Sequence, residues 1–226
     1  MFVGHLALGL AAKPATPRVS LAVLLTASQL ADILWPFFLA LGLEEVRIAP
    51  GITAFTPLDF VSYPYSHSLV MLVVWGLVFG AIYRMVTGRN GRVFIVLAAL
   101  VVSHWILDWI SHRPDMPIYP GGPKFGLGLW NHVAATIIVE GIMFAAGIWI
   151  YVRATRARDA VGRWGFVSLM AFLAVLYVVN AISSPPPSVN AIVIMAIAGF
   201  TLLTAWSWWA DHHRDVILTG PPGRQP

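Results

Sequence analysis

Six long apolar runs constrain this chain more than any other feature of its sequence. Each run has about 18 or more mostly uncharged residues, long enough for a helix to cross the hydrocarbon core of a bilayer. With 58% of its residues hydrophobic and 11% charged, the chain also cannot cover a water-facing surface. The sequence therefore predicts an all-α, polytopic membrane helix bundle of about six transmembrane helices. The predicted spans are 19–43, 68–87, 92–112, 129–152, 164–183 and 188–210.

A further apolar segment, from Phe2 to Ala12, is too short to cross the membrane. The pair Lys13-Pro14 ends it, because proline cannot continue a helix and lysine belongs at an interface. We predict a short N-terminal helix that is half-inserted or interfacial. The segment lacks the basic residues that precede the apolar core of a signal peptide, so we expect it to be retained.

No long polar stretch divides the 226 residues, so we predict a single transmembrane domain over residues 1–218. The residues with recognisable chemistry fall in a first half, about 1–120, whereas the half from 121 to 218 has no assigned role. The tail 219–226 is polar and rich in proline and glycine, which predicts disorder.

Lysine and arginine concentrate in alternate loops of the predicted topology. The loops 84–92 and 153–163 are rich in arginine, whereas 44–67 and 113–128 hold few cations and the turn 184–188 holds none. The positive-inside rule then predicts a multi-pass protein of the cell inner membrane with both termini in the cytoplasm. Because the cations are spread over short loops, we predict the lipid bilayer as a partner and no nucleic acid. The sequence leaves the oligomeric state open.

The third predicted span contains the strongest group of ionisable residues, in SHWILDWISH. His104, Asp108 and His112 recur every four residues and so share one face of a helix. Ionisable groups inside a membrane are costly unless paired or bound to an ion, which makes each a candidate functional residue. Imidazole and carboxylate are suitable ligands for zinc and related ions, and the chain has no cysteine. One helix face offers two or three ligands at most, so other segments must complete a site.

Other segments supply such residues. Asp32 lies in the first predicted span and His67 opens the second, both in the outer half of the membrane by the predicted topology. His5 lies eight residues before Lys13, about 12 Å deeper than the inner interface if that lysine marks it. We therefore predict a divalent metal, zinc first, bound by a subset of His5, Asp32, His67, His104 and Asp108.

Three more residues are candidates for the same site. His112 lies at the outer end of the stripe in the third span. His132 and Glu140 belong to a second four-residue stripe in the fourth span, which could line the same cavity or pair with Arg113. Polar residues at such spacing equally serve to dock one helix on another.

The order of these motifs resembles a known family. A GH pair near the start, an aspartate in the first long helix, a SHSL segment and then SHWILD are similar to motifs of the YdjM-like family of membrane-bound metal-dependent hydrolases. That family is in turn similar to the zinc-dependent phospholipase C proteins. The resemblance covers roughly residues 1–120 and implies hydrolysis at a metal centre.

The family's motifs can be matched one position at a time. Its GH histidine matches His5, the first acidic residue of its PDxD motif matches Asp32, and the histidine of its THS motif matches His67. Its SHxxxD pair matches His104 and Asp108.

Two family positions differ in this chain. The second aspartate of PDxD falls on Leu34, and the first histidine of HRxxTHS falls on Ser62. These departures imply fewer metal ions, a substitute ligand such as Asp59 or His112, or a member that no longer catalyses.

We predict an integral inner-membrane hydrolase, with zinc, that acts on a lipid or lipid-linked ester, because ligands among apolar helices favour a substrate that arrives through the bilayer. A transporter or channel lined by the same residues is an alternative. A non-catalytic protein that binds metal or haem is another, and a structural subunit is a third. The sequence leaves open whether the protein is an enzyme.

Overall fold

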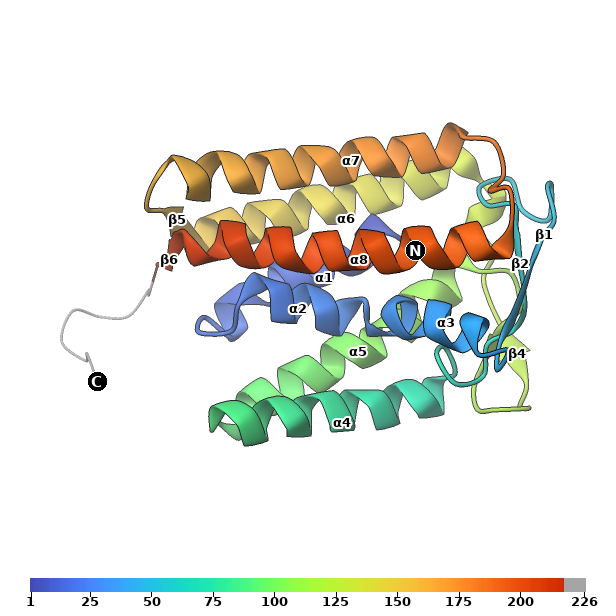
Figure 1. Cartoon of the computed structure of the whole chain (residues 1–226), viewed down its shortest axis with the longest axis horizontal. Coiled ribbons are helices and arrows are strands. Elements are labelled where there is room, and N and C mark those ends of the chain that lie inside the picture. Colours follow the sequence, from blue (N-terminus) through green and yellow to red (C-terminus); the bar gives the residue numbers. More distant parts are fainter. Residues whose placement is uncertain (218–226) are drawn as a thin grey trace.

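The computed structural model describes residues 1–217 and shows helices running side by side along its longest axis (Figure 1). Within that range five helices are long and apolar enough to cross a membrane, and there are up to six spans if one bent pair of shorter helices counts as a span. The protein is thus an all-α, multi-pass membrane bundle, as its apolar runs predict. The predicted disordered tail, 219–226, lies outside the described residues.

The helices are α1 (Val3–Ala11), α2 (Leu21–Ser28), α3 (Leu30–Ala40), α4 (Leu69–Thr87), α5 (Gly91–Ser111), α6 (Val133–Ala154), α7 (Phe166–Ile182) and α8 (Val189–His212). Three shorter helical turns are η1 (Lys13–Ala15), η2 (Leu129–Asn131) and η3 (Val161–Gly165).

Small polar residues define where the spanning helices begin. The Ser68 side chain accepts a hydrogen bond from the Met71 amide at the start of α4, and Asn90 accepts one from the Val93 amide at the start of α5. Such caps satisfy amides that have no partner inside the helix. Because these residues flank the apolar runs, the helix boundaries fall within a few residues of the predicted spans.

The first predicted span, 19–43, is not one continuous helix. It consists of α2 and α3, which meet at an angle of 60°. Gln29 lies at the break, where it ends α2 and precedes α3. Inside an unbroken helix the Ser28 carbonyl would accept the amide four residues later. At this break it accepts a hydrogen bond from His104 instead.

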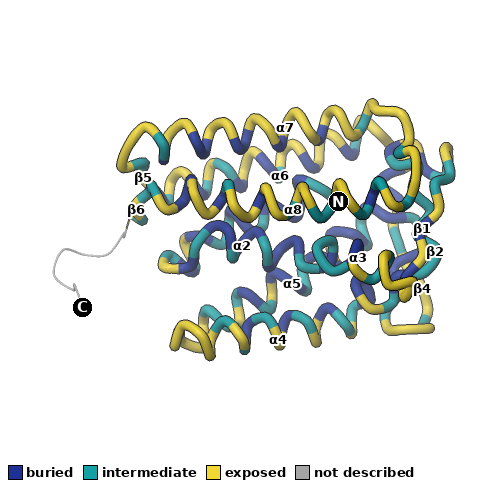
Figure 2. Tube along the Cα trace, in the orientation of Figure 1, coloured by how far each residue is buried: buried dark blue, intermediate teal, exposed yellow. Residues whose placement is uncertain are grey.

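The N-terminal helix α1, which the sequence predicts as half-inserted or interfacial, lies inside the bundle. Seven of its nine residues are buried, and it packs against α6, α2 and α5. Figure 2 shows that the exposed surface lies mainly on the outer helices around it. The Met1 amino group is also inside the bundle, where it bonds to Asp108 and Ser111. Helix α1 runs from there to Lys13, at the end of the bundle that carries β5 and β6.

Close contacts at two glycines fix the place of α1. A Cβ atom at Gly147 on α6 would lie 2.6 Å from the Ala7 backbone oxygen, and one at Gly9 would lie 3.0 Å from the Leu24 oxygen. Backbone atoms cannot rotate away, so both positions need glycine. The second half of the chain, to which the sequence assigned no role, therefore encloses α1.

Short antiparallel strand pairs, which the sequence did not predict, lie at the two ends of the bundle. Strand β1 (Glu45–Ile48) pairs with β2 (Leu58–Ser62), and β3 (Met116–Pro117) pairs with β4 (Lys124–Phe125). Figure 1 shows these at one end of the bundle. At the opposite end β5 (Thr155–Ala157) pairs with β6 (Arg214–Val216).

Candidate metal centre

Two histidines and two aspartates from three segments converge inside the bundle. His104 and Asp108 lie on α5, Asp32 in the first turn of α3, and His67 immediately before the cap of α4. His104 Nε2 lies 3.1 Å from Asp108 Oδ2 and 3.7 Å from Asp32 Oδ1. His67 Nε2 lies 3.3 Å from Asp32 Oδ1 and 3.9 Å from Asp108 Oδ2. Nitrogen and oxygen atoms of four side chains therefore face one shared space.

The break between α2 and α3 orients His104. Its Nδ1 lies 2.9 Å from the backbone oxygen of Ser28, which can only accept, so Nδ1 carries the proton. The unprotonated Nε2 then faces the two aspartates. In metal centres a ligating imidazole usually donates its other N–H to a carbonyl or carboxylate in this way.

Ser66 and Glu44 orient His67 in the way that the Ser28 carbonyl orients His104, through a hydrogen bond from Nδ1. Ser66 Oγ donates to Glu44 Oε2 at 2.6 Å and lies 2.6 Å from His67 Nδ1. Because the serine proton goes to the carboxylate, Ser66 Oγ accepts from His67 Nδ1, and His67 Nε2 is free as a ligand. Glu44 is itself held by the backbone amides of Tyr65 and Ser66, each at 2.8 Å.

Asp115 orients a third imidazole, that of His112. His112 Nδ1 lies 3.0 Å from Asp115 Oδ1, and His112 Nε2 lies 3.9 Å from Asp108 Oδ2. Burial alone would raise the pKa of Asp115, but hydrogen bonds from His112, Tyr63 and Arg113 hold that pKa below its usual value. Burial and the neighbouring Asp115 raise the pKa of Tyr63, which therefore stays protonated as a donor.

His5 approaches Asp108 from α1. Its Nε2 lies 3.0 Å from Asp108 Oδ1, and its ring stacks on that of His104 with centroids 3.6 Å apart. Rings in such contact leave no room for a porphyrin between them, which disfavours haem held by this pair. The amino group of Met1 also bonds to Asp108. The five predicted ligands are thus close together, and His5 approaches the cluster beside Asp108 and His104.

The donor set fits a divalent cation. The ligand atoms of Asp32, His67 and His104 lie within 4.8 Å of one another, and so do those of His5, His104 and Asp108. Ligands about 2.0 to 2.2 Å from zinc in a tetrahedral shell lie roughly 3.4 Å apart, so small side-chain movements would close either set. His104 Nε2 is buried without a hydrogen-bond partner among residues 1–217, which is uncommon for a polar atom.

The centre is buried except at Asp32. The side chains of His67, His104 and Asp108 are at most 3% exposed, whereas that of Asp32 is 27% exposed. A small molecule or a lipid group would therefore meet the cluster on the side of α3.

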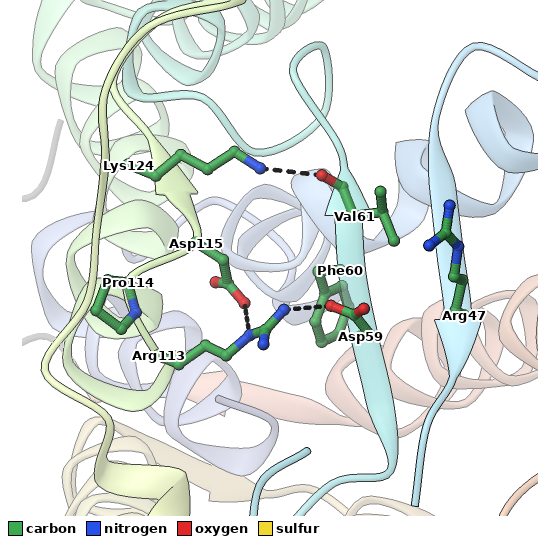
Figure 3. A pocket seen from close by; sticks show the side chains of 8 residues that line it. All are labelled: Arg47, Asp59, Phe60, Val61, Arg113, Pro114, Asp115 and Lys124. Atoms are coloured by element: carbon green, nitrogen blue, oxygen red, sulfur yellow. Dashed lines mark hydrogen bonds and ion pairs between the residues drawn. The ribbon is translucent and has the colours of Figure 1, made fainter.

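A cavity of about 440 Å³ lies beside the centre at the hairpin end (Figure 3). Arg113 spans it and donates to both Asp59 and Asp115, while Lys124 donates to the Val61 oxygen at 2.9 Å. Asp115 lines this cavity and bonds His112, so it joins the cavity to the centre. Asp59, considered from the sequence as a substitute ligand, belongs to this cavity rather than to the converging atoms.

The second polar stripe does not reach the cluster as ligands. His132 is exposed and precedes α6. Glu140 is buried, and its Oε2 accepts from the amides of Phe2 and Gly4, so it caps the start of α1 rather than pairing with Arg113. Glu140 therefore acts in helix docking, which the sequence left open for this stripe.

Sequence reasoning missed the residues that orient the imidazoles. Glu44 and Ser66 lie outside the predicted spans, and Asp115 follows the third span in a loop. A carboxylate three residues after His112 was the available signal for Asp115, since a turn brings such residues together. The Ser28 carbonyl had no signal, because it depends on the break in the helix.

Comparisons with family models, curated proteins and solved structures find no match to this chain. The functional evidence is therefore the geometry of the centre together with the motif order of the first 120 residues.

Proposed function

We propose that the protein is a membrane-embedded metal-dependent hydrolase, with zinc as its metal, that acts on a lipid or lipid-linked ester. One observation carries the proposal: the rings of His67, His104 and His112 each have Nδ1 bonded to an acceptor and Nε2 directed at Asp32 or Asp108. Purely structural histidines have no need for this shared orientation. The resemblance to the YdjM-like family supports the same conclusion.

The residues divide into two roles. Asp32, His67, His104 and Asp108 would hold the ion, because their ligand atoms face one another. A bound zinc lowers the pKa of its water to about 7 and polarises a phosphoryl or carbonyl oxygen. His5, on the other side of Asp108, would hold that carboxylate in place.

The surroundings favour a lipid substrate. The helices around the centre expose large apolar side chains to the bilayer, and the partly exposed Asp32 lies on a helix with exposed Phe37. The loop charges favour placing the β5–β6 end of the bundle at the cytoplasmic face of the inner membrane. The metal centre would then lie in the outer half of the membrane. An ester group near the headgroup region is then within reach.

Metal analysis is the first test. Purified wild-type protein should contain close to one equivalent of divalent ion, and His104→Ala and Asp108→Asn should each retain less than about a tenth of it, because both residues supply ligand atoms. Mass-spectrometric metal quantification measures this. The exposed His132→Ala is the matched control and should keep wild-type content. Negligible metal in all four proteins would overturn the proposal.

A catalytic role requires a second measurement on the loaded protein. Phospholipids and lipid-linked esters in mixed micelles should be hydrolysed by wild type, with activity lost on chelation and in His104→Ala. Stoichiometric metal without hydrolysis of any such ester would favour a metal-binding protein that is not an enzyme.

Removing the partner of His112 should weaken metal binding without abolishing it. Asp115→Asn removes the charge that orients His112, whose Nε2 faces the ligand Asp108, and changes outside the ligand shell typically cost about 10 to 100-fold in affinity or activity. Competition with a fluorescent zinc chelator would measure it. Asp59→Asn, which also removes a partner of Arg113 but does not touch His112, should stay near wild type. Equal affinity in both variants would remove Asp115 from the centre.

A further inference from the structure

A second cavity, of about 300 Å³, lies at the end of the bundle opposite the hairpins β1–β2 and β3–β4. The loop after α1, the end of α8 and the paired strands β5 and β6 surround it. The proposed hydrolase chemistry makes no use of it. Its charged lining consists of Lys13, Arg18, Arg158, Arg214, Asp211 and Asp215.

Lys13 and Asp211 form an ion pair in one wall of the cavity, where their charges cancel. Lys13 Nζ lies 3.0 and 2.9 Å from the two oxygens of Asp211, and both side chains are buried. The Asp211 carboxylate also accepts from Tyr151 Oη at 2.5 Å and from the Leu21 amide at 2.8 Å. These contacts occupy both oxygens of Asp211, and Lys13 already balances its negative charge, so it does not neutralise the other cations.

Apart from the Lys13–Asp211 pair, the charged side chains that line the cavity are three arginines and one carboxylate, Asp215. Arg214 donates to Thr155 Oγ1 and to a backbone oxygen, and it has no carboxylate partner within residues 1–217. Arg158 reaches Asp215 only at 3.7 Å, between two well-exposed side chains, and such pairs are weak. Arg18 is exposed and makes no ion pair with a described residue. The cavity therefore keeps a net positive charge.

The cavity lies where lipid headgroups would be. Trp208 lines it, is 54% exposed and follows the apolar outward face of α8. Tryptophan collects at the depth of the headgroups, and basic pockets between membrane helices bind anionic headgroups. Guanidinium groups match phosphate oxygens in bidentate pairs.

We propose that this cavity binds a phosphate group, carried either by an anionic phospholipid headgroup or by a soluble phosphate compound. Arg18 and Arg158 hold its oxygens at the mouth, and Arg214 adds charge from the wall. This site is separate from the metal centre and does not depend on the hydrolase proposal.

Native mass spectrometry of the full chain in detergent, titrated with phosphatidylglycerol or phosphatidylcholine, tests the site. Wild type should prefer phosphatidylglycerol. A basic residue near an anionic surface contributes on the order of fivefold in affinity, so Arg18→Gln/Arg158→Gln should bind it about 25-fold more weakly. The control Arg84→Gln/Arg89→Gln removes two cations that do not line the cavity and should keep wild-type affinity.

Equal affinity in all three proteins, or an equal loss in the control, would overturn the proposal. Adding inorganic phosphate distinguishes the two sources. If phosphate displaces phosphatidylglycerol at concentrations comparable to that of the lipid, the site is assigned to a soluble phosphate compound. If it does not displace the lipid, the site is assigned to the headgroup. If the double variant unfolds, Arg18→Gln alone replaces it, since Arg18 is exposed and makes no ion pair within residues 1–217. That variant should bind phosphatidylglycerol about fivefold more weakly, and unchanged binding would reject the site.

Discussion

Asp211→Asn is expected to destabilise the folded protein by about 3 to 5 kcal/mol, because it leaves the Lys13 ammonium buried without its counter-charge. Both side chains of this pair are at most 7% exposed, so water cannot replace the lost partner. The pair also ties the end of α1 to the end of α8. Thermal unfolding in one detergent, followed by fluorescence of the tryptophans, would measure the loss.

Companion variants separate charge from packing. Lys13→Met should cost less than Asp211→Asn, since Asp211 keeps the donors Tyr151 and Leu21. The double variant Lys13→Met/Asp211→Leu should recover part of the loss, because replacing both ions leaves neither one unpaired. Glu45→Gln breaks an exposed pair with Arg47 and should cost less than about 1 kcal/mol. A loss at Asp211 no larger than that at Glu45 would contradict the role assigned to the pair.

Gly147→Leu is expected to prevent recovery of folded protein and to empty the metal centre. A Cβ atom there would lie 2.6 Å from the oxygen and 2.8 Å from the Cα of Ala7, both backbone atoms of α1. Helix α1 must then move away from α6 and take His5 with it. The smaller Gly147→Ala should fold with a loss of about 1 to 3 kcal/mol, as overpacking usually costs.

Gly141 provides a matched control on the same helix. It is exposed, and a Cβ atom there would meet nothing within 4 Å, so Gly141→Leu should fold and bind metal normally. Size-exclusion profiles and metal content of the three variants measure the effect. Normal metal content in a folded Gly147→Leu would show that α1 does not position the centre.

The spans were predictable because length and hydropathy decide them almost alone. Each of the six predicted runs coincides with a long helix or with the bent pair α2–α3. The break itself was not predictable, because Gln29 is an unremarkable helix residue and the proline of that run, Pro36, lies inside α3. The burial of α1 was equally hidden, since it depends on a contact between Ala7 and Gly147, far apart in the sequence.

For the centre, helical spacing could place His104 and Asp108 together, because both lie on one face of one helix. The arrival of His67 and Asp32 depends on how three segments pack, which spacing does not encode. The orientation of the imidazoles depends on Glu44, Ser66 and a backbone carbonyl, none of which has a local pattern. The hydrolytic activity and the metal remain predictions.

The position of α1 also sets the order in which the protein can be assembled. This helix precedes α2 to α8 along the chain, yet it is too short to span the membrane alone. It packs against α6, α2 and α5, and Lys13, just after it, binds Asp211 at the end of α8. We therefore expect His5 to settle beside Asp108 only after α6 has entered the bilayer, and the Lys13–Asp211 pair to form only with α8. A chain stopped before α6 would carry every predicted ligand and still lack the helix against which α1 packs.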